Sequence, residues 1–426
     1  MNRLVVAGLA GCLGLSACSN PAADQAPVRP EAYSDEWFAL SDPAFGARYL
    51  GVNMHDTEHA KAGRLVLADG SAVALRVLPP DQADGDVRFI APALGVSYTA
   101  SLQPDSEWRG RWSEPGSEAA EVVLTPRAEA IVETGGQFVV LPDGRRMHMV
   151  CTGEGSPVVV LDYGAGGTVK KDWGAIAVAI ADKAQTRVCA YDRAGRGLSD
   201  PGPMPRNAAA VVADMDGMLT AAKLPPPYVL IGHSLGSYHV RLFANTFPDK
   251  VGGMVLIDPS GDGQLERFNA AIPKLAELQA AQSSAQAELD CVNRLRVAPA
   301  PPNDPLAQQC GGNDPDAMEA TLSEIEQMPG ASTQQLTASH RSYGDMPLVV
   351  LTRTDYERDM PTDFTAEDRA NMRKIWEEMH TEMAALSQQS WHRFVPGASH
   401  YIQRDNPEAV VEAAADVVTA LRAASH

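Results

Sequence analysis

The stretch from Tyr228 to Ser237, which reads YVLIGHSLGS, constrains the fold of this chain more than any other. An apolar run that is typical of a buried strand ends at Gly232, and Ser234 stands between this glycine and Gly236. A sharp turn from a strand into a helix strains its central residue, and side chains two positions away would collide. We therefore expect a strand, a tight turn that lifts the Ser234 hydroxyl clear of a sheet, and a helix over 238–247.

Apolar runs alternate with helical segments through the C-terminal two thirds of the chain. The predicted strands are 137–141, 147–150, 157–161, 187–191, 228–231, 254–257, 348–351 and 392–395. Helices are predicted near 173–184 and 207–222, and a last one begins near Pro407. Such an alternation predicts a mostly parallel sheet with helices on both faces. The first two strands flank a Pro-Asp-Gly turn and are expected to form a hairpin.

The alternation stops between Asp258 and Met346. This segment is polar, has the composition of helices, and contains proline and cysteine. An insertion at the carboxyl ends of parallel strands lies over the face where α/β proteins bind their ligands. We expect residues 259–345 to form a helical cap over the site around Ser234.

The region before the sheet has a different texture. Residues 36–127 carry short alternating runs, such as 72–78 and 120–124, separated by turn residues. This pattern predicts a small antiparallel β domain. Residues 19–35 are rich in alanine, proline and acidic residues and are expected to form a flexible tether.

The first 18 residues have the features of an export signal. Arg3 gives a positive start, and the apolar stretch 4–15 is too short to span a bilayer. Leu15-Ser16-Ala17-Cys18 resembles the bacterial lipobox, in which the cysteine is lipidated, and Ser19 in place of aspartate favours outer-membrane sorting. We therefore expect an exported bacterial lipoprotein, anchored only by lipid to the outer membrane and facing the periplasm. The alternative is an ordinary cleaved signal without lipid on Cys18.

Net charge and missing motifs argue against several classes of partner, cofactor and metal site. The 426 residues carry a formal net charge of -19, which argues against nucleic acid or an anionic membrane surface as a partner. The glycine-rich stretch 164–167 lacks the lysine of a P-loop and the spacing of a dinucleotide fingerprint. Neither a Cys-x-x-Cys motif nor a Cys/His cluster indicates a metal site. We expect no cofactor and no metal.

Cysteine usage is consistent with an oxidising compartment. Two of the six cysteines belong to the segment of residues 1–18, and the other four are Cys151, Cys189, Cys291 and Cys310. Proximity in sequence favours a disulfide between Cys291 and Cys310, across a proline-rich loop. Cys151 and Cys189 then either pair with each other or remain buried thiols.

A serine hydroxyl is a weak nucleophile and needs a neighbouring base. Gly397-Ala398-Ser399-His400 comes directly after the last predicted strand, where a base in the order serine, acid, histidine is expected. His400 is therefore the predicted base for Ser234. His239, in the helix that follows the serine, is expected to be a packing residue.

Four motifs together resemble the α/β-hydrolase fold family, in its serine-esterase-like branch. They are Gly232–Gly236 (GHSLG), Asp192–Ser199 (DRAGRGLS), Val255–Pro259 (VLIDP) and Gly397–Ile402 (GASHYI). The resemblance covers about two thirds of the chain and places a hydrolase domain over residues 136–426. It implies a mostly parallel eight-stranded sheet flanked by helices. It also implies that Ser234 attacks an acyl carbon and that the backbone N–H of Leu235 helps to form an oxyanion hole.

Two departures from the family pattern matter. The family carries His-Gly after its third strand, where this chain has Tyr163-Gly164, so the second oxyanion donor is inferred to be Ala165. The acid is ambiguous, because Asp258 ends one strand and Asp355 follows the next. We favour Asp258 slightly and keep Asp355 as the alternative acid. Asp192, in a loop that the resemblance implies to be a turn, is expected to bond backbone N–H groups instead.

The predicted activity is the hydrolysis of a carboxylic ester in a small acyl substrate, through an acyl-enzyme and without a cofactor. A serine nucleophile, in place of an aspartate, weighs against the haloalkane and epoxide branches of the family. Peptidase, lactonase, thioesterase or perhydrolase activity would use the same triad, because fold and triad do not define the leaving group. The rival from another class is a ligand-sensing binding protein, with the β domain as its binding module.

Overall fold

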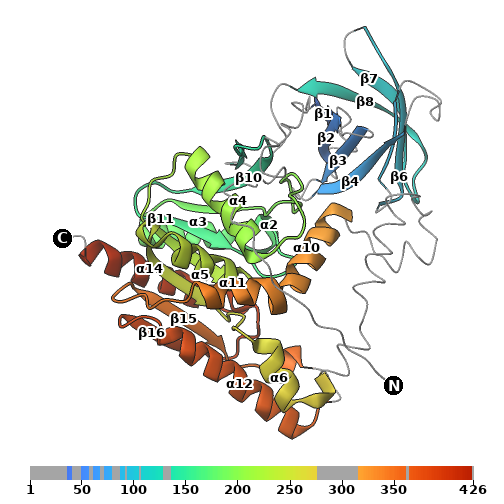
Figure 1. Ribbon diagram of the computed structural model, residues 1–426. Helices are drawn as coiled ribbons and strands as arrows, with labels where there is room; N and C mark the ends of the chain where they lie inside the picture. Colours follow the sequence, from blue (N-terminus) through green and yellow to red (C-terminus); the bar gives the residue numbers. More distant parts are fainter. Residues whose placement is uncertain are drawn as a thin grey trace, which may run out of the picture.

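The computed structural model describes residues 36–40, 49–56, 61–67, 72–78, 87–91, 94–104, 107–127, 136–275, 315–360 and 364–424 (Figure 1). The expected signal peptide over 1–18, the tether over 19–35 and the predicted Cys291–Cys310 disulfide lie outside these residues. In the described ranges, no helix combines the length and the apolar character needed to cross a lipid bilayer.

The N-terminal strands form a closed antiparallel barrel. They are β1 (Glu36–Leu40), β2 (Tyr49–Asp56), β3 (Lys61–Leu67), β4 (Ala72–Leu78), β5 (Val87–Ala91), β6 (Val96–Leu102), β7 (Trp108–Ser113) and β8 (Ala120–Arg127). Strand β8 closes the barrel by pairing with β1, with Arg127 opposite Trp37. Phe89, Tyr98 and Trp112 are fully buried inside it, with ring centroids 5.0 to 6.0 Å apart. The expected antiparallel sheet is confirmed, and its closure is an additional finding.

The second sheet has eight strands in the order β16-β15-β14-β13-β11-β12-β10-β9. The strands are β9 (Gly136–Val140), β10 (Arg146–Thr152), β11 (Val158–Asp162), β12 (Val188–Tyr191), β13 (Tyr228–His233), β14 (Val251–Ile257), β15 (Leu348–Arg353) and β16 (Ser390–Val395). From β12 to β16 all neighbours are parallel, whereas β10 is antiparallel to both β9 and β12. This arrangement confirms the mostly parallel eight-stranded sheet and its leading hairpin.

Helices cover both faces of this sheet, because successive residues of each buried strand point to opposite sides. In β13, for example, Leu230 packs in an apolar cluster with buried residues of α4 (Ala208–Ala221), α5 (Gly236–Thr246) and α12 (Ala366–Ala384). Its neighbour Ile231 packs in the cluster that contains α3 (Gly174–Ala184) and α14 (Pro407–Ala424). The sheet therefore forms the middle layer of three (Figure 1).

Helical elements connect β14 to β15, as the insertion predicts. The described ones are α6 (Gln264–Ala271), α10 (Pro315–Gln327), a π-helical turn η4 (Met328–Ser332) and α11 (Thr333–Ala338). Helix α12, between β15 and β16, is absent from the expected elements. It begins with a capping box, in which Thr365 and Asp368 exchange hydrogen bonds, and few of its residues are buried. That sparse apolar pattern explains why periodicity does not mark it.

Cys151 and Cys189 form a disulfide. They lie directly opposite each other in the antiparallel pair of β10 and β12, with their Cα atoms 4.1 Å apart. Of the two alternatives left open for these cysteines, the structure therefore supports pairing and not free thiols.

Candidate active site

The turn after β13 has the strained geometry that its glycines predict. Ser234 has a φ of +51°, in the left-handed region, and its N–H donates to Ile257 O at 3.0 Å. A Cβ on Gly232 would lie 2.7 Å from Gly236 O, and a Cβ on Gly236 would lie 2.7 Å from Asp162 O. Neither position tolerates a side chain. Helix α5 begins at Gly236, two residues earlier than expected.

Ser234, His400 and Asp258 come together from distant parts of the chain. The Nε2 atom of His400 lies 2.9 Å from Ser234 Oγ, and its Nδ1 atom lies 2.6 Å from Asp258 Oδ2. His400 stands between β16 and α13 (Ile402–Asp405), and Asp258 directly follows β14. When the neutral ring carries its proton on Nδ1 and donates to Asp258, Nε2 is left to accept the Ser234 hydroxyl proton.

The carboxylate of Asp258 is fully buried and fully engaged. Besides His400, it accepts hydrogen bonds from the backbone N–H of Arg353 at 3.1 Å and from Trp376 Nε1 at 3.0 Å. Burial by itself raises the pKa of Asp258, but the His400 hydrogen bond and the Arg353 charge overcome it and hold the pKa below its ordinary value. Asp258 is therefore ionised at neutral pH.

Asp355 lies apart from this group. Its carboxylate pairs with Arg358 at 3.2 Å, its side chain is 29% exposed, and its backbone N–H donates to Ala398 O. Of the two predicted acids, the structure thus brings Asp258 to His400 and leaves Asp355 in a surface ion pair.

The loop after β11 runs directly beside the nucleophile. A Cβ on Gly164 would lie 3.1 Å from Ser234 Cβ and 2.8 Å from His233 Nδ1, so only glycine fits there. Ala165 follows in this loop, and Leu235 stands at the N-cap of α5. Within the described residues, neither of their N–H groups donates to a protein acceptor. The two predicted oxyanion donors therefore stand next to residues of the site, since Ala165 follows Gly164 and Leu235 follows Ser234.

His233 contacts both the backbone and the ring of His400, and no motif in the sequence predicts this role. Its Nε2 donates to His400 O at 2.9 Å, and the two ring centroids lie 4.8 Å apart. Burial, with a smaller contribution from His400, lowers the pKa of His233 to about 3, so the ring is neutral. Trp376 is not predicted either, although it is the one tryptophan in the charged stretch 366–384.

Two other polar residues near the site have structural roles. Asp192 is buried and accepts hydrogen bonds from the backbone N–H groups of Val169 and Leu198, as expected, and it also bonds His148 Nδ1 at 2.8 Å. His239 is buried too, but it bonds Asp162 at 2.8 Å and is thus more than a packing residue. Over the part of the chain that the structure describes, no group of three or more His, Cys, Asp or Glu residues could hold a metal ion.

The chain belongs to the alpha/beta hydrolase family, whose model matches residues 158–413. The uncharacterized protein YqjL of Bacillus subtilis (strain 168) is 27% identical over 266 residues, 62% of this chain and 85% of that protein. The crystal structure of DBJA (mutant dbja delta) matches with a TM-score of 0.50 and 16% identity, over 68% of this chain and 99% of its own. The enol-lactonase from Burkholderia xenovorans LB400 matches with a TM-score of 0.44 and 16% identity, over 66% and 100%. Family model and fold together confirm the expected α/β-hydrolase fold.

Proposed function

We propose that this protein is a serine hydrolase that cleaves a carboxylic ester, or a related acyl bond, through Ser234, His400 and Asp258. The observation that supports this most is the continuous hydrogen-bonded chain from Ser234 Oγ through His400 to Asp258, at 2.9 and 2.6 Å. The left-handed backbone of Ser234 adds to it, because strained residues that the fold holds in place cluster at active sites.

In this proposal, His400 Nε2 takes the hydroxyl proton as Ser234 Oγ attacks the acyl carbon. Ionised Asp258 keeps the other proton on Nδ1 and stabilises the imidazolium that forms. His400 then returns its proton to the leaving alcohol, and an acyl-enzyme remains on Ser234. Water, activated by the same histidine, attacks this ester and releases the acid, so no cofactor takes part.

The negative charge that develops on the acyl oxygen needs donors held in place beforehand. The N–H groups of Leu235 and Ala165 are the proposed pair, since both stand next to residues of the site and neither is used by another described residue. The N-terminus of α5 adds a favourable partial charge at the same point. Loss of one such donor typically costs about 10²- to 10³-fold in kcat.

A fluorophosphonate probe and a short-chain aryl ester test the proposal together. The wild-type protein should be labelled at Ser234 and should turn over the ester repeatedly, and Ser234→Ala should lose both properties. Ser342→Ala, at an exposed serine, is the matched control and should keep both. Hydrolysis by Ser234→Ala at the wild-type rate would refute the proposal. The same assay on amides, lactones and thioesters would separate an esterase from the related activities.

We also propose that the chain is exported and anchored through lipid on Cys18 to the outer membrane, facing the periplasm. The four residues Leu15–Cys18, which resemble a lipobox, support this proposal. Labelled palmitate should be incorporated into the wild-type protein and not into Cys18→Ala. Equal labelling of the two would exclude lipidation at this cysteine.

A further inference from the structure

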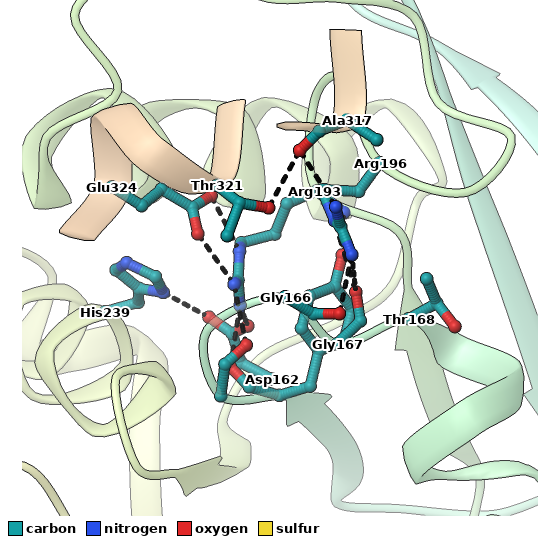
Figure 2. Close-up of polar contacts among 12 residues, drawn as sticks. Asp162, Gly166, Gly167, Thr168, Arg193, Arg196, His239, Ala317, Thr321 and Glu324 are labelled. Carbon is teal, nitrogen blue, oxygen red and sulfur yellow. Dashed lines mark hydrogen bonds and ion pairs between the residues drawn. The ribbon is translucent and has the colours of Figure 1, made fainter. Parts of the chain in front are cut away.

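The side chain of Arg193 lies against the loop that follows β11 (Figure 2). Its Nη1 donates to Tyr163 O at 2.7 Å, and its Nη2 donates to Gly164 O at 3.0 Å. The guanidinium also lies 4.1 Å from the centre of the Tyr163 ring. Arg193 is fully buried, so these bonds form where no water competes for the carbonyl oxygens.

The carbonyl of Gly164 and the N–H of Ala165 belong to the same peptide group. The cis peptide bonds among the described residues all precede prolines, so this peptide is trans, and its C=O and N–H point in opposite directions. A guanidinium that holds the carbonyl on one side therefore fixes the direction of the N–H on the other. A charged donor on the carbonyl also polarises the peptide and strengthens its N–H as a donor.

Helix α10 of the cap holds Arg193 in turn. Glu324 accepts two parallel bonds from it, from Nε at 2.9 Å and from Nη2 at 2.7 Å. Asp162 accepts from Nη1 at 2.6 Å and also bonds His239 (Figure 2). Glu324 and Asp162 are 2% and 0% exposed, so this ion cluster is buried and geometrically constrained on every side.

Arg196, which stands with Arg193 in the loop after β12, makes a second connection between α10 and the loop after β11. Arg196 donates to Gly166 O at 2.6 Å and to Ala317 O, in the first turn of α10, at 2.8 Å. The helix lies close to the loop here, since a Cβ on Gly166 would lie 3.8 Å from Thr321 Cγ2. The loop beside Ser234 is thus joined to α10 at two points (Figure 2).

We propose that Arg193 and Glu324 are positioning residues for the oxyanion site, so that cap helix α10 sets the direction of the Ala165 N–H. This inference rests on the serine-hydrolase function proposed above. Glu324 holds the guanidinium, the guanidinium holds the Gly164 carbonyl, and that peptide presents its N–H toward Ser234. In this proposal the cap does more than select substrates. The packing of α10 on the loop after β11 also affects how well the transition state is stabilised.

Glu324→Gln tests this directly, because the amide keeps the side-chain shape but loses the charge and one of the two acceptors. With a short-chain aryl ester, kcat should fall about 10- to 100-fold, somewhat less than for loss of a whole oxyanion donor. KM should stay within about threefold, because the oxyanion forms only in the transition state. The inhibition constant of a trifluoromethyl ketone, which forms an oxyanion adduct with a serine, should rise by the same factor as kcat falls.

Asp262→Asn is the matched control. Asp262, in the loop before α6, accepts a similar pair of bonds, at 2.7 and 3.0 Å, from the buried Arg241 of α5. That pair also joins the cap segment to the core but touches no carbonyl of the loop beside Ser234. Asp262→Asn should lose less thermal stability than Glu324→Gln, because the Asp262 side chain is 30% exposed and Glu324 is buried. Its kcat and ketone binding should stay within about twofold of wild type.

The outcomes separate this inference from the function on which it rests. If wild type is active and Glu324→Gln matches Asp262→Asn in kcat and ketone binding, the positioning role is wrong and the serine hydrolase stands. If wild type takes neither the ketone nor a fluorophosphonate at Ser234, both fall. Should Glu324→Gln fail to fold, Glu324→Asp replaces it, because the shorter side chain keeps the charge but cannot keep both bonds to Arg193. In that variant kcat should fall about 3- to 10-fold at constant KM, and an unchanged kcat would overturn the proposal.

Discussion

Two neighbouring strands of the large sheet are each followed by an aspartate, and the two surroundings differ sharply. Asp258, after β14, is fully buried between His400 and Trp376. Asp355, after β15, is partly exposed and paired with Arg358. In the sequence the two positions are nearly equivalent, since each carries a carboxylate shortly after an apolar strand. The packing of α12 over one of them makes the difference, so a strand end alone does not identify a catalytic acid.

Removal of each carboxylate in turn is the strongest test of which aspartate supports His400. Asp258→Asn should lower kcat by about 10³- to 10⁴-fold, because an asparagine does not keep the His400 proton on Nδ1. Asp355→Asn should stay within about twofold of wild type, as surface substitutions usually do. Turnover of one aryl ester by both variants, with their melting curves compared, measures this. A large loss in Asp355→Asn with little in Asp258→Asn would reverse the assignment.

The pH dependence of stability tests the same comparison, because a neutral histidine lies beside the buried segment that contains Asp258. His380 of α12 donates from Nε2 to Pro259 O at 2.9 Å, and its Nδ1 lies 2.6 Å from Thr352 Oγ1. Burial lowers the pKa of His380 to about 4. An unfolded histidine takes up its proton near pH 6.5, so the stability that His380 contributes is complete above pH 6.5 and is lost as the pH falls toward 4.

Between pH 7 and pH 5, this one group should lower the free energy of unfolding by about 2 kcal/mol. His380→Gln should remove that part of the pH dependence, and His340→Gln, at an exposed histidine, should leave it unchanged. Urea unfolding at the two pH values, followed by tryptophan fluorescence, gives the difference. Equal slopes for wild type and His380→Gln would show that this histidine takes up its proton in the folded protein as well.

Much of the fold could be predicted, because most strands of the large sheet are recognisable from short apolar runs in the sequence. The buried strands of the large sheet are continuous apolar runs, and β13 is observed over Tyr228–His233 where 228–231 is predicted. Closure of the barrel could not be predicted, because alternation describes the faces of each strand and not the pairing of β8 with β1. Helix α12 has too few buried residues for periodicity to mark it.

The candidate site divides in the same way. Ser234 and His400 could be predicted, because each stands in a short motif at the end of a recognisable strand. The choice between two aspartates could not, since it depends on a tertiary contact with Trp376. Glu324 gives no signal at all in the sequence. It lies in a polar helix and acquires its role only when α10 packs over the loop beside Ser234.

The smallest expected effect concerns Trp376 of α12, which packs over Asp258 and not over Asp355. Trp376→Phe keeps an aromatic ring stacked on Phe268, whose centroid lies 5.7 Å away, and removes only the N–H that donates to Asp258. A lost hydrogen bond of this kind is worth about 1 kcal/mol, or roughly fivefold in kcat. The pKa of Asp258 should rise, because its charged form loses a donor.

Kinetics of Trp376→Phe should therefore show a modest loss of kcat at neutral pH. Trp391→Phe provides the matched control, since this tryptophan is 37% exposed on the edge strand β16. If both variants behave like wild type, the contacts with His400 and the Arg353 backbone are enough to hold Asp258. Its difference from Asp355 would then lie in burial alone and not in the donor that α12 supplies.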